Sequence, residues 1–135
     1  SHIPDPCVRL VLSGNGPERE HLEALAEKKG VRDRITFPGW VAEQELMRHI
    51  QSADIFVLPA WRTDLTSVLL LEALVFATPV IVPSDTALAW VAGKSALHFR
   101  DGDARDLARA ITELIASSAL RVELSKGAVE GLQEL

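Results

Sequence analysis

Apolar residues recur along the chain in a pattern that predicts alternating strands and helices. Short aliphatic runs of strand length occupy positions 8–12, 35–37, 55–58, 80–82 and 96–99. Segments with helical spacing of apolar residues occupy positions 18–29, 43–52, 86–91, 104–117 and 119–133. Strands that alternate with helices of about 10 to 15 residues are typical of a parallel sheet covered on both faces. We therefore expect a Rossmann-like, doubly wound α/β fold of about five strands.

One further segment differs from these helices because it is apolar on every face. The run VLLLEALVF, positions 68–76, contains a single charged residue, Glu72. A helix that is apolar all round is usually buried between other elements. An ionised carboxylate left dry and unpaired there costs several kcal/mol. Glu72 is therefore expected either to pair with another protein group or to bind a ligand.

The loops that follow the strands form the candidate site, because ligands of doubly wound folds bind beyond the carboxyl ends of the strands. The longest of them, 59–67, leads into the helix of Glu72. We expect this helix to begin near Thr66-Ser67, where free N–H groups and two hydroxyls suit an anion such as a phosphate. From Thr66 to Glu72 the helix rises about 9 Å, at roughly 1.5 Å per residue. That length is close to the span from a diphosphate to the ribose of a nucleotide.

Composition narrows the class of protein. The 135 residues are 47% hydrophobic and 24% charged, which fits one folded domain, 1–135, in which Ser1-His2 is interpreted as a cloning remnant. The net charge of −5 disfavours binding to nucleic acid or to anionic membranes. A single cysteine, Cys7, fits a reducing cytoplasmic setting, and no apolar stretch reaches the roughly 18 residues of a membrane span.

Structural roles remain as alternatives for several of these residues. Asp64 is a good helix cap, and Glu72 could pair with an internal Arg or Lys. Glycines in the 14–17 loop are often needed only for a positive φ. The tryptophans are as consistent with rim or core positions as with stacking on a ligand. The histidines lack the spacing of a catalytic triad or of a zinc site.

Taken together, six segments resemble the C-terminal domain of family 4 retaining GT-B glycosyltransferases. They are LVLSGNGPEREHLEALA, ITFPGWV, DIFVLPA, DLTSVLLLEAL, TPVIV and LHFRDGDARDLARAI, from Val8 to about Leu135. In that family the domain binds the nucleotide sugar, and two acids with seven residues between them contact the sugar and the ribose. The matching pair here is Asp64 and Glu72.

The resemblance implies a role for each matching position. Asp64 would contact the transferred sugar and Glu72 the ribose hydroxyls, and these two are the expected catalytic residues. The amides and hydroxyls of residues 66–68 would bind the diphosphate. The base would lie at Trp40-Val41. The full set of expected donor-binding residues is Gly14, Gly16, Trp40, Val41, Pro59, Thr66, Ser67, Val68 and Glu72.

The sequence departs from the family pattern in three places. The first acid is Asp, and it is followed by Thr66-Ser67 in place of the usual Phe-Gly. Ala77 stands where a Gly usually precedes Thr-Pro, so the end of the helix is expected to shift. Nothing matches the family's first strand and helix, which carry an Arg and a Lys for the diphosphate, and only Arg62 is a nearby substitute. That strand normally lies between those matching 8–12 and 54–58, so two strand edges should be left unpaired or forced together.

We therefore interpret the chain as the donor-binding half of a retaining glycosyltransferase that transfers a hexose from a nucleoside-diphosphate sugar, without metal or other cofactor. Its expected partners are the donor and an N-terminal acceptor-binding domain, with no nucleic acid and with possible self-association through an unpaired sheet edge. The isolated chain should be inactive. The expected location is cytoplasmic, or membrane-peripheral for the full-length enzyme. The alternatives are a non-catalytic GT-B-like binding or scaffold domain and, more remotely, a GT-B-like epimerase.

Overall fold

The computed structural model describes residues 7–13, 16–59 and 64–133, and for residues 64–67 the description covers the backbone alone. The chain forms two compact units, Ser1–Leu46 and Met47–Leu135, and each is described by itself. The assignment of residues 1–135 to one nucleotide-sugar-binding domain stays a prediction.

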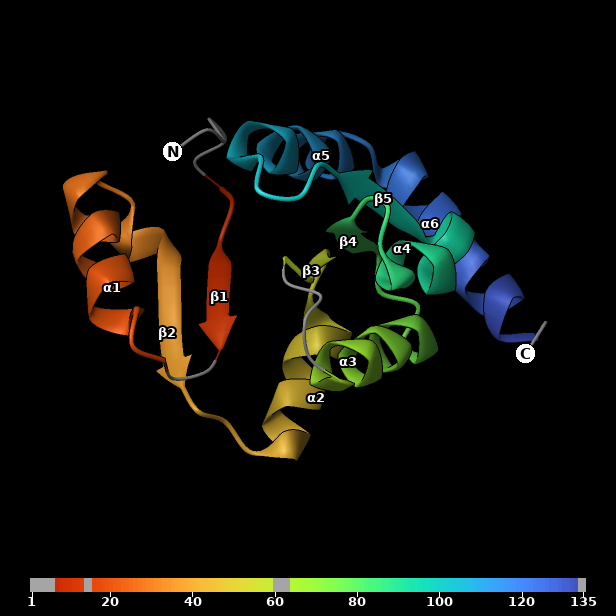
Figure 1. Ribbon diagram of the computed structural model, residues 1–135, viewed down its shortest axis with the longest axis horizontal. Coiled ribbons are helices and arrows are strands. Elements are labelled where there is room, and N and C mark those ends of the chain that lie inside the picture. Colours follow the sequence, from red (N-terminus) through yellow and green to blue (C-terminus); the bar gives the residue numbers. More distant parts are fainter. Residues whose placement is uncertain (1–6, 14–15, 60–63, 134–135) are drawn as a thin grey trace. The chain divides into compact units, whose positions relative to one another are not determined.

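The first unit holds two parallel strands and a helix (Figure 1). Strand β1 (Leu10–Ser13) pairs with β2 (Ile35–Gly39), and helix α1 (Arg19–Lys28) and a 3-10 turn, η1 (Arg32–Arg34), lie between them in sequence. The second strand continues through Pro38, where the sequence pattern placed its end. Proline is found on edge strands, and β2 pairs with β1 alone among the described strands.

Helix α2 (Glu43–Ser52) contains the boundary between the units, and the second unit follows it. Its three strands, β3 (Phe56–Val57), β4 (Val80–Pro83) and β5 (Ala96–Phe99), form a parallel sheet in the order β3-β4-β5. Its helices are α3 (Asp64–Val75), α4 (Ala87–Ala92), α5 (Ala104–Ala116) and α6 (Ser118–Gln133), with a 3-10 turn, η2 (Gly93–Ser95).

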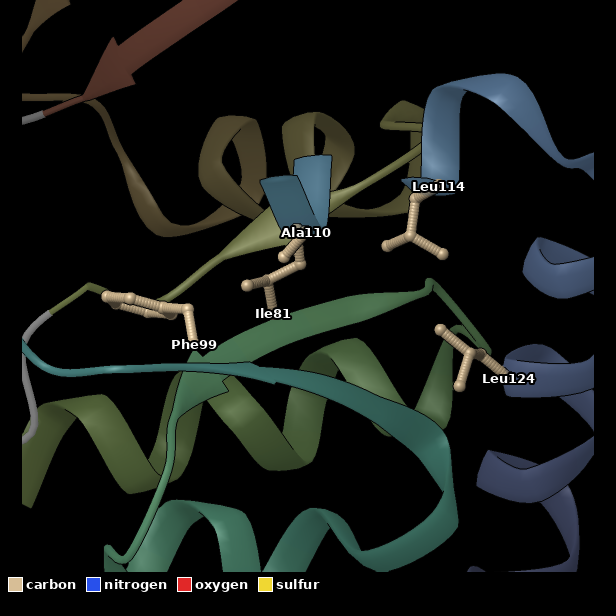
Figure 2. Close-up of a cluster of buried hydrophobic side chains, with 5 residues drawn as sticks. All are labelled: Ile81, Phe99, Ala110, Leu114 and Leu124. Atoms are coloured by element: carbon tan, nitrogen blue, oxygen red, sulfur yellow. The ribbon is translucent and has the colours of Figure 1, made fainter. Parts of the chain in front are cut away.

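The core of the second unit is built around the central strand β4, all of which is buried. Figure 2 shows Ile81 of this strand among apolar side chains from β5, α5 and α6, namely Phe99, Ala110, Leu114 and Leu124. Because side chains alternate along a strand, Val80 and Val82 face the other side, where α3 and α4 contact β4. Helices therefore cover both faces of this sheet.

The predicted fold class is confirmed, with one correction to its sheet. The expected parallel strands alternate with helices in the expected order, but they form two sheets instead of one. Among the described residues β1 pairs only with β2 and β3 only with β4, so one edge of β1 and one of β3 are unpaired. This is one of the two outcomes expected because nothing in the sequence matches the family's first strand. Self-association through these edges stays a prediction.

A second correction concerns the beginning of α3. The helix begins at Asp64, whereas the sequence analysis placed residues 59–67 in a loop. Positions 64–67 contain no Gly or Pro, and Asp and Thr are favourable in the first turn of a helix. The helix therefore extends farther toward β3 than its apolar run alone suggests.

Candidate functional site

The carboxyl ends of β3, β4 and β5 meet at one edge of the second unit because the three strands are parallel. Three loops emerge there. One begins at Pro59 and leads into α3, one spans residues 84–86 and leads into α4, and one spans residues 100–103 and leads into α5. This edge is where the sequence predicts the donor site.

The N-terminus of α3 lies beyond the first of these loops. The first four N–H groups of a helix have no partner within it, so the free amides of α3 begin at Asp64 and not at Thr66. Val68 is the fifth residue, and its amide belongs to the helical ladder. The side chains of Asp64, Thr66 and Ser67 lie outside the description, so their predicted contacts stay predictions.

Glu72 is half-buried, which corrects the expectation of a buried acid. Helix α3 buries one face, including Leu70 at 0% exposure, and leaves the other open. Val68, Leu71 and Val75 are 51%, 43% and 61% exposed. Their spacing of three and four residues places them on one face of the helix. The all-round apolar sequence overstated the burial, because within the second unit no described element covers this face.

The carboxylate of Glu72 makes no hydrogen bond or ion pair with any described residue, so the internal Arg or Lys partner considered for it is not found in that part of the chain. Position 72 lies eight positions after position 64, with seven residues between them. On an α-helix this spacing corresponds to roughly 12 Å along the axis and roughly 80° around it. Helical register therefore places the two positions on the same side of α3, with Val68 between them.

In the first unit the predicted glycine loop borders a small pocket. Gly16 is exposed, and its carbonyl accepts a hydrogen bond of 3.2 Å from the backbone N–H of Arg19. The pocket has a volume of about 340 Å³ and is lined by Leu12, Ser13, Gly16, Pro17, Glu18, Arg19, Leu22 and Phe37. A Cβ built on Gly16 meets no atom within 4 Å, so space alone does not require glycine there. Gly14 lies outside the described residues.

The wall of this pocket contains a cluster that sequence reasoning missed. Arg19 donates a hydrogen bond of 2.9 Å to the carbonyl of Phe37. The guanidinium carbons of Arg19 and Arg32 lie 5.9 and 4.9 Å from the centre of the Phe37 ring. Glu23 pairs with both arginines, at 3.4 and 4.0 Å. Arg19 lies 18 residues before Phe37 and Arg32 lies five residues before it. No local motif indicates that both side chains converge on its ring.

The remaining predicted residues divide between the units. Trp40 follows β2 and is 78% exposed, and Val41 beside it is half-buried. Pro59 follows β3 and is exposed. The structure thus collects Gly16, Trp40 and Val41 in the first unit, and it collects Pro59, Val68 and Glu72 in the second.

The loop after β5 is fixed by an ion pair that the sequence analysis also missed. Asp106 accepts hydrogen bonds from Arg109 Nε at 2.7 Å and from the backbone N–H of Arg100 at 2.6 Å. Arg109 also pairs with Glu113 at 2.8 Å and donates to the carbonyl of His98 at 3.0 Å. The Arg109 guanidinium and the Arg100 amide hold the pKa of Asp106 below its usual value. The two carboxylates raise the pKa of Arg109.

Neither a metal site nor a membrane-spanning helix is found in the described part of the chain. It contains no group of three or more His, Cys, Asp or Glu side chains arranged to hold a metal ion. None of its helices is both long and apolar enough to cross a membrane.

The matching family model and a similar protein are both described as glycosyltransferases. The family model described as "Glycosyl transferases group 1" matches residues 2–130. The lipopolysaccharide core biosynthesis glycosyltransferase LpsE of Rhizobium meliloti (strain 1021) is 33% identical over 129 residues, which are 94% of this chain and 37% of that protein. The chain thus spans little more than a third of the length of this relative.

Solved structures show the same fold. Sucrose-phosphate synthase from Thermosynechococcus elongatus superposes with a TM-score of 0.79 and 28% identity, over 94% of this chain and 34% of that one. HepE from Anabaena, in complex with UDP and glucose, superposes with a TM-score of 0.80 and 18% identity, over 96% of this chain and 37% of that one. At that identity the likeness to HepE establishes the fold alone.

Proposed function

The chain belongs to the group 1 glycosyl transferases, and from this membership we propose that it binds the nucleoside-diphosphate sugar donor of a retaining glycosyltransferase. Within a longer protein it serves the transfer of a hexose. The observation that carries the proposal is Glu72, a half-buried carboxylate in an apolar helix with no partner among the described residues. A carboxylate accepts hydrogen bonds from hydroxyls, and a ribose offers two neighbouring ones.

The proposed donor follows α3 from its beginning to Glu72. Free amides in the first turn of the helix bind the diphosphate, because a helix N-terminus attracts negative charge. Glu72 binds the ribose, and Asp64 contacts the transferred sugar. Support comes from the fold shared with HepE, which was solved with UDP and glucose.

The base lies at Trp40-Val41 in this proposal, and Gly14, Gly16, Pro59, Thr66, Ser67 and Val68 complete the donor site. Helix amides take the place of a metal ion in stabilising the diphosphate leaving group, so transfer is metal-independent. Configuration at the sugar is retained. The single cysteine supports a cytoplasmic setting.

Substitution Glu72→Gln tests the proposal. It removes the charged acceptor for the ribose hydroxyls, and we expect affinity for UDP, measured by isothermal titration calorimetry, to fall at least tenfold, that is by about 1.4 kcal/mol or more. Because Glu72 is half-buried without a described partner, the melting temperature should change by less than about 2 °C.

Glu130→Gln is the matched control, because Glu130 is an exposed acid on α6, beside a pocket at the amino ends of β3 and β4 and not at their carboxyl ends. This control should change neither the affinity for UDP nor the melting temperature. A large loss of stability in Glu72→Gln with unchanged nucleotide affinity would refute the ligand role and assign Glu72 to the fold.

A further inference from the structure

Asp85, in the loop between β4 and α4, combines backbone strain with an unused carboxylate. Its φ is 58°, in the left-handed region that residues other than glycine seldom adopt. The side chain is exposed and makes no hydrogen bond or ion pair with any described residue. An Asp in this conformation usually benefits from a local hydrogen bond, and here that compensation is missing.

Residues on both sides hold Asp85 in place. Ser84 donates to the carbonyl of Phe99 through its backbone N–H, at 2.8 Å, and through its hydroxyl, at 3.1 Å. The Thr86 hydroxyl donates to the carbonyl of Pro83 at 2.7 Å and accepts from the N–H of Ala89 at 3.3 Å. The loop is therefore fixed to β5 on one side and to the first turn of α4 on the other. A group on such a loop is presented to a ligand without further ordering.

The position of the loop brings it to the edge of the proposed donor site. Val57 of β3 is paired with Ile81 of β4, and the next N–H, that of Leu58, donates to the carbonyl of Ile81 at 3.0 Å. Neighbouring strands lie about 4.8 Å apart. The chain leaving β4 toward Asp85 therefore starts beside the chain that leaves β3 toward α3.

We propose that Asp85 accepts hydrogen bonds from hydroxyls of the donor's sugar and so helps to select it. This inference rests on the proposed function. A fixed, unneutralised carboxylate repels a diphosphate but suits neutral hydroxyl donors. Glycine fits the left-handed backbone more readily. The carboxylate therefore favours binding of the donor, whereas glycine at this position would give a more stable fold.

Two variants of the 135-residue chain distinguish the effect of the carboxylate on binding from the effect of the backbone conformation on stability. Asp85→Gly relieves the backbone and should raise the melting temperature by about 3 °C. Asp85→Asn keeps a residue that tolerates the left-handed region and should leave the melting temperature unchanged. In both variants we expect affinity for UDP-glucose to fall about tenfold while affinity for UDP stays the same. GDP-mannose and GDP form a second probe pair, used in the same way.

Asp54→Asn is the charge-matched control, because Asp54 is an exposed acid just before β3, at the opposite end of the strand. It should leave both affinities unchanged. If the variants bind each sugar nucleotide and its diphosphate in the same ratio as the parent chain, Asp85 is only a turn residue and the inference fails. If the parent chain binds neither UDP nor GDP, the proposed function itself fails, and this inference fails with it.

Discussion

At the scale of single residues, Ala77 shows how the sequence departs from its family at a cost in strain. The residue has a φ of 55°. Its N–H donates to the carbonyl of Leu74 and that of Thr78 to the carbonyl of Ala73, both at 3.0 Å. This is the helix-closing pattern that normally uses glycine. We expected the substitution to shift the end of the helix, but the structure keeps the glycine-type ending with an alanine in it.

Thr78 helps to hold this ending in place, because its buried hydroxyl donates to the carbonyl of Ile50 at 3.0 Å. Substitution Ala77→Gly should relieve the left-handed strain and raise the free energy of unfolding by about 1 kcal/mol. Gly30, with a φ of 72° at the end of α1, provides the reverse change. Gly30→Ala should lower the free energy by a similar amount. Urea denaturation measures both changes in the free energy of unfolding. Changes of the same sign in the two variants would contradict the strain argument.

At the scale of elements, helix α6 approaches the η2 turn so closely that it needs a glycine. A Cβ on Gly127 would lie 2.8 Å from the carbonyl oxygen of Lys94. Gly131, one turn later, has open space around it. Gly127→Ala should therefore destabilise the chain by about 2 kcal/mol, as an overpacked contact does.

Gly131→Ala serves as the matched control and should stabilise the chain by roughly 0.5 to 1 kcal/mol through helix propensity. Thermal unfolding of the two variants measures the difference. A gain in stability for both would mean that α6 and η2 are farther apart in solution. The glycines of α6 look alike in the sequence, and only their neighbours in space distinguish them.

The loop between β5 and α5 should contribute less to the stability of the fold at low pH. The pKa of Asp106 is lowered by Arg109 and by the Arg100 amide, so its ionised form stabilises the fold. This contribution is complete above the unfolded value of about 3.8 and is lost as pH falls through the lower folded value. Asp106→Asn should therefore lower the urea midpoint near neutral pH, with the difference from the parent chain shrinking below about pH 4. Asp54→Asn is the control, and a constant difference at all pH values would contradict this origin.

At the scale of the whole molecule, we expect these residues to bind the donor without transferring its sugar. Transfer needs donor and acceptor held together, and this chain spans 37% of its relative LpsE. We expect the 135 residues alone to bind UDP-glucose, with or without EDTA, and to transfer no glucose to added acceptors. Radiolabelled donor provides the measurement for both steps. Transfer by these residues alone would contradict the proposed inactivity, and loss of binding in EDTA would contradict metal independence.

Local patterns in the sequence were sufficient for most elements of the fold. The alternation of apolar runs with helical periods predicted every strand and most helix positions, because that periodicity reflects which face of each element is buried. The same patterns placed Glu72 on a helix behind the loop after β3. They missed the start of α3, since Asp64, Thr66 and Ser67 are polar and are typical of a loop, whereas the backbone there is helical.

The sequence by itself determined the order of parallel strands and helices, and the presence of an acid in an apolar helix, because both depend on neighbours along the chain. Tertiary structure decided that the strands form two sheets, that α3 buries only one face so that Glu72 is half-buried, and that Arg19 and Arg32 meet at Phe37. It also decided that Asp85, in the loop after β4, has a left-handed backbone and no partner among the described residues. These features depend on which elements pack together, and residues far apart in sequence supply those contacts.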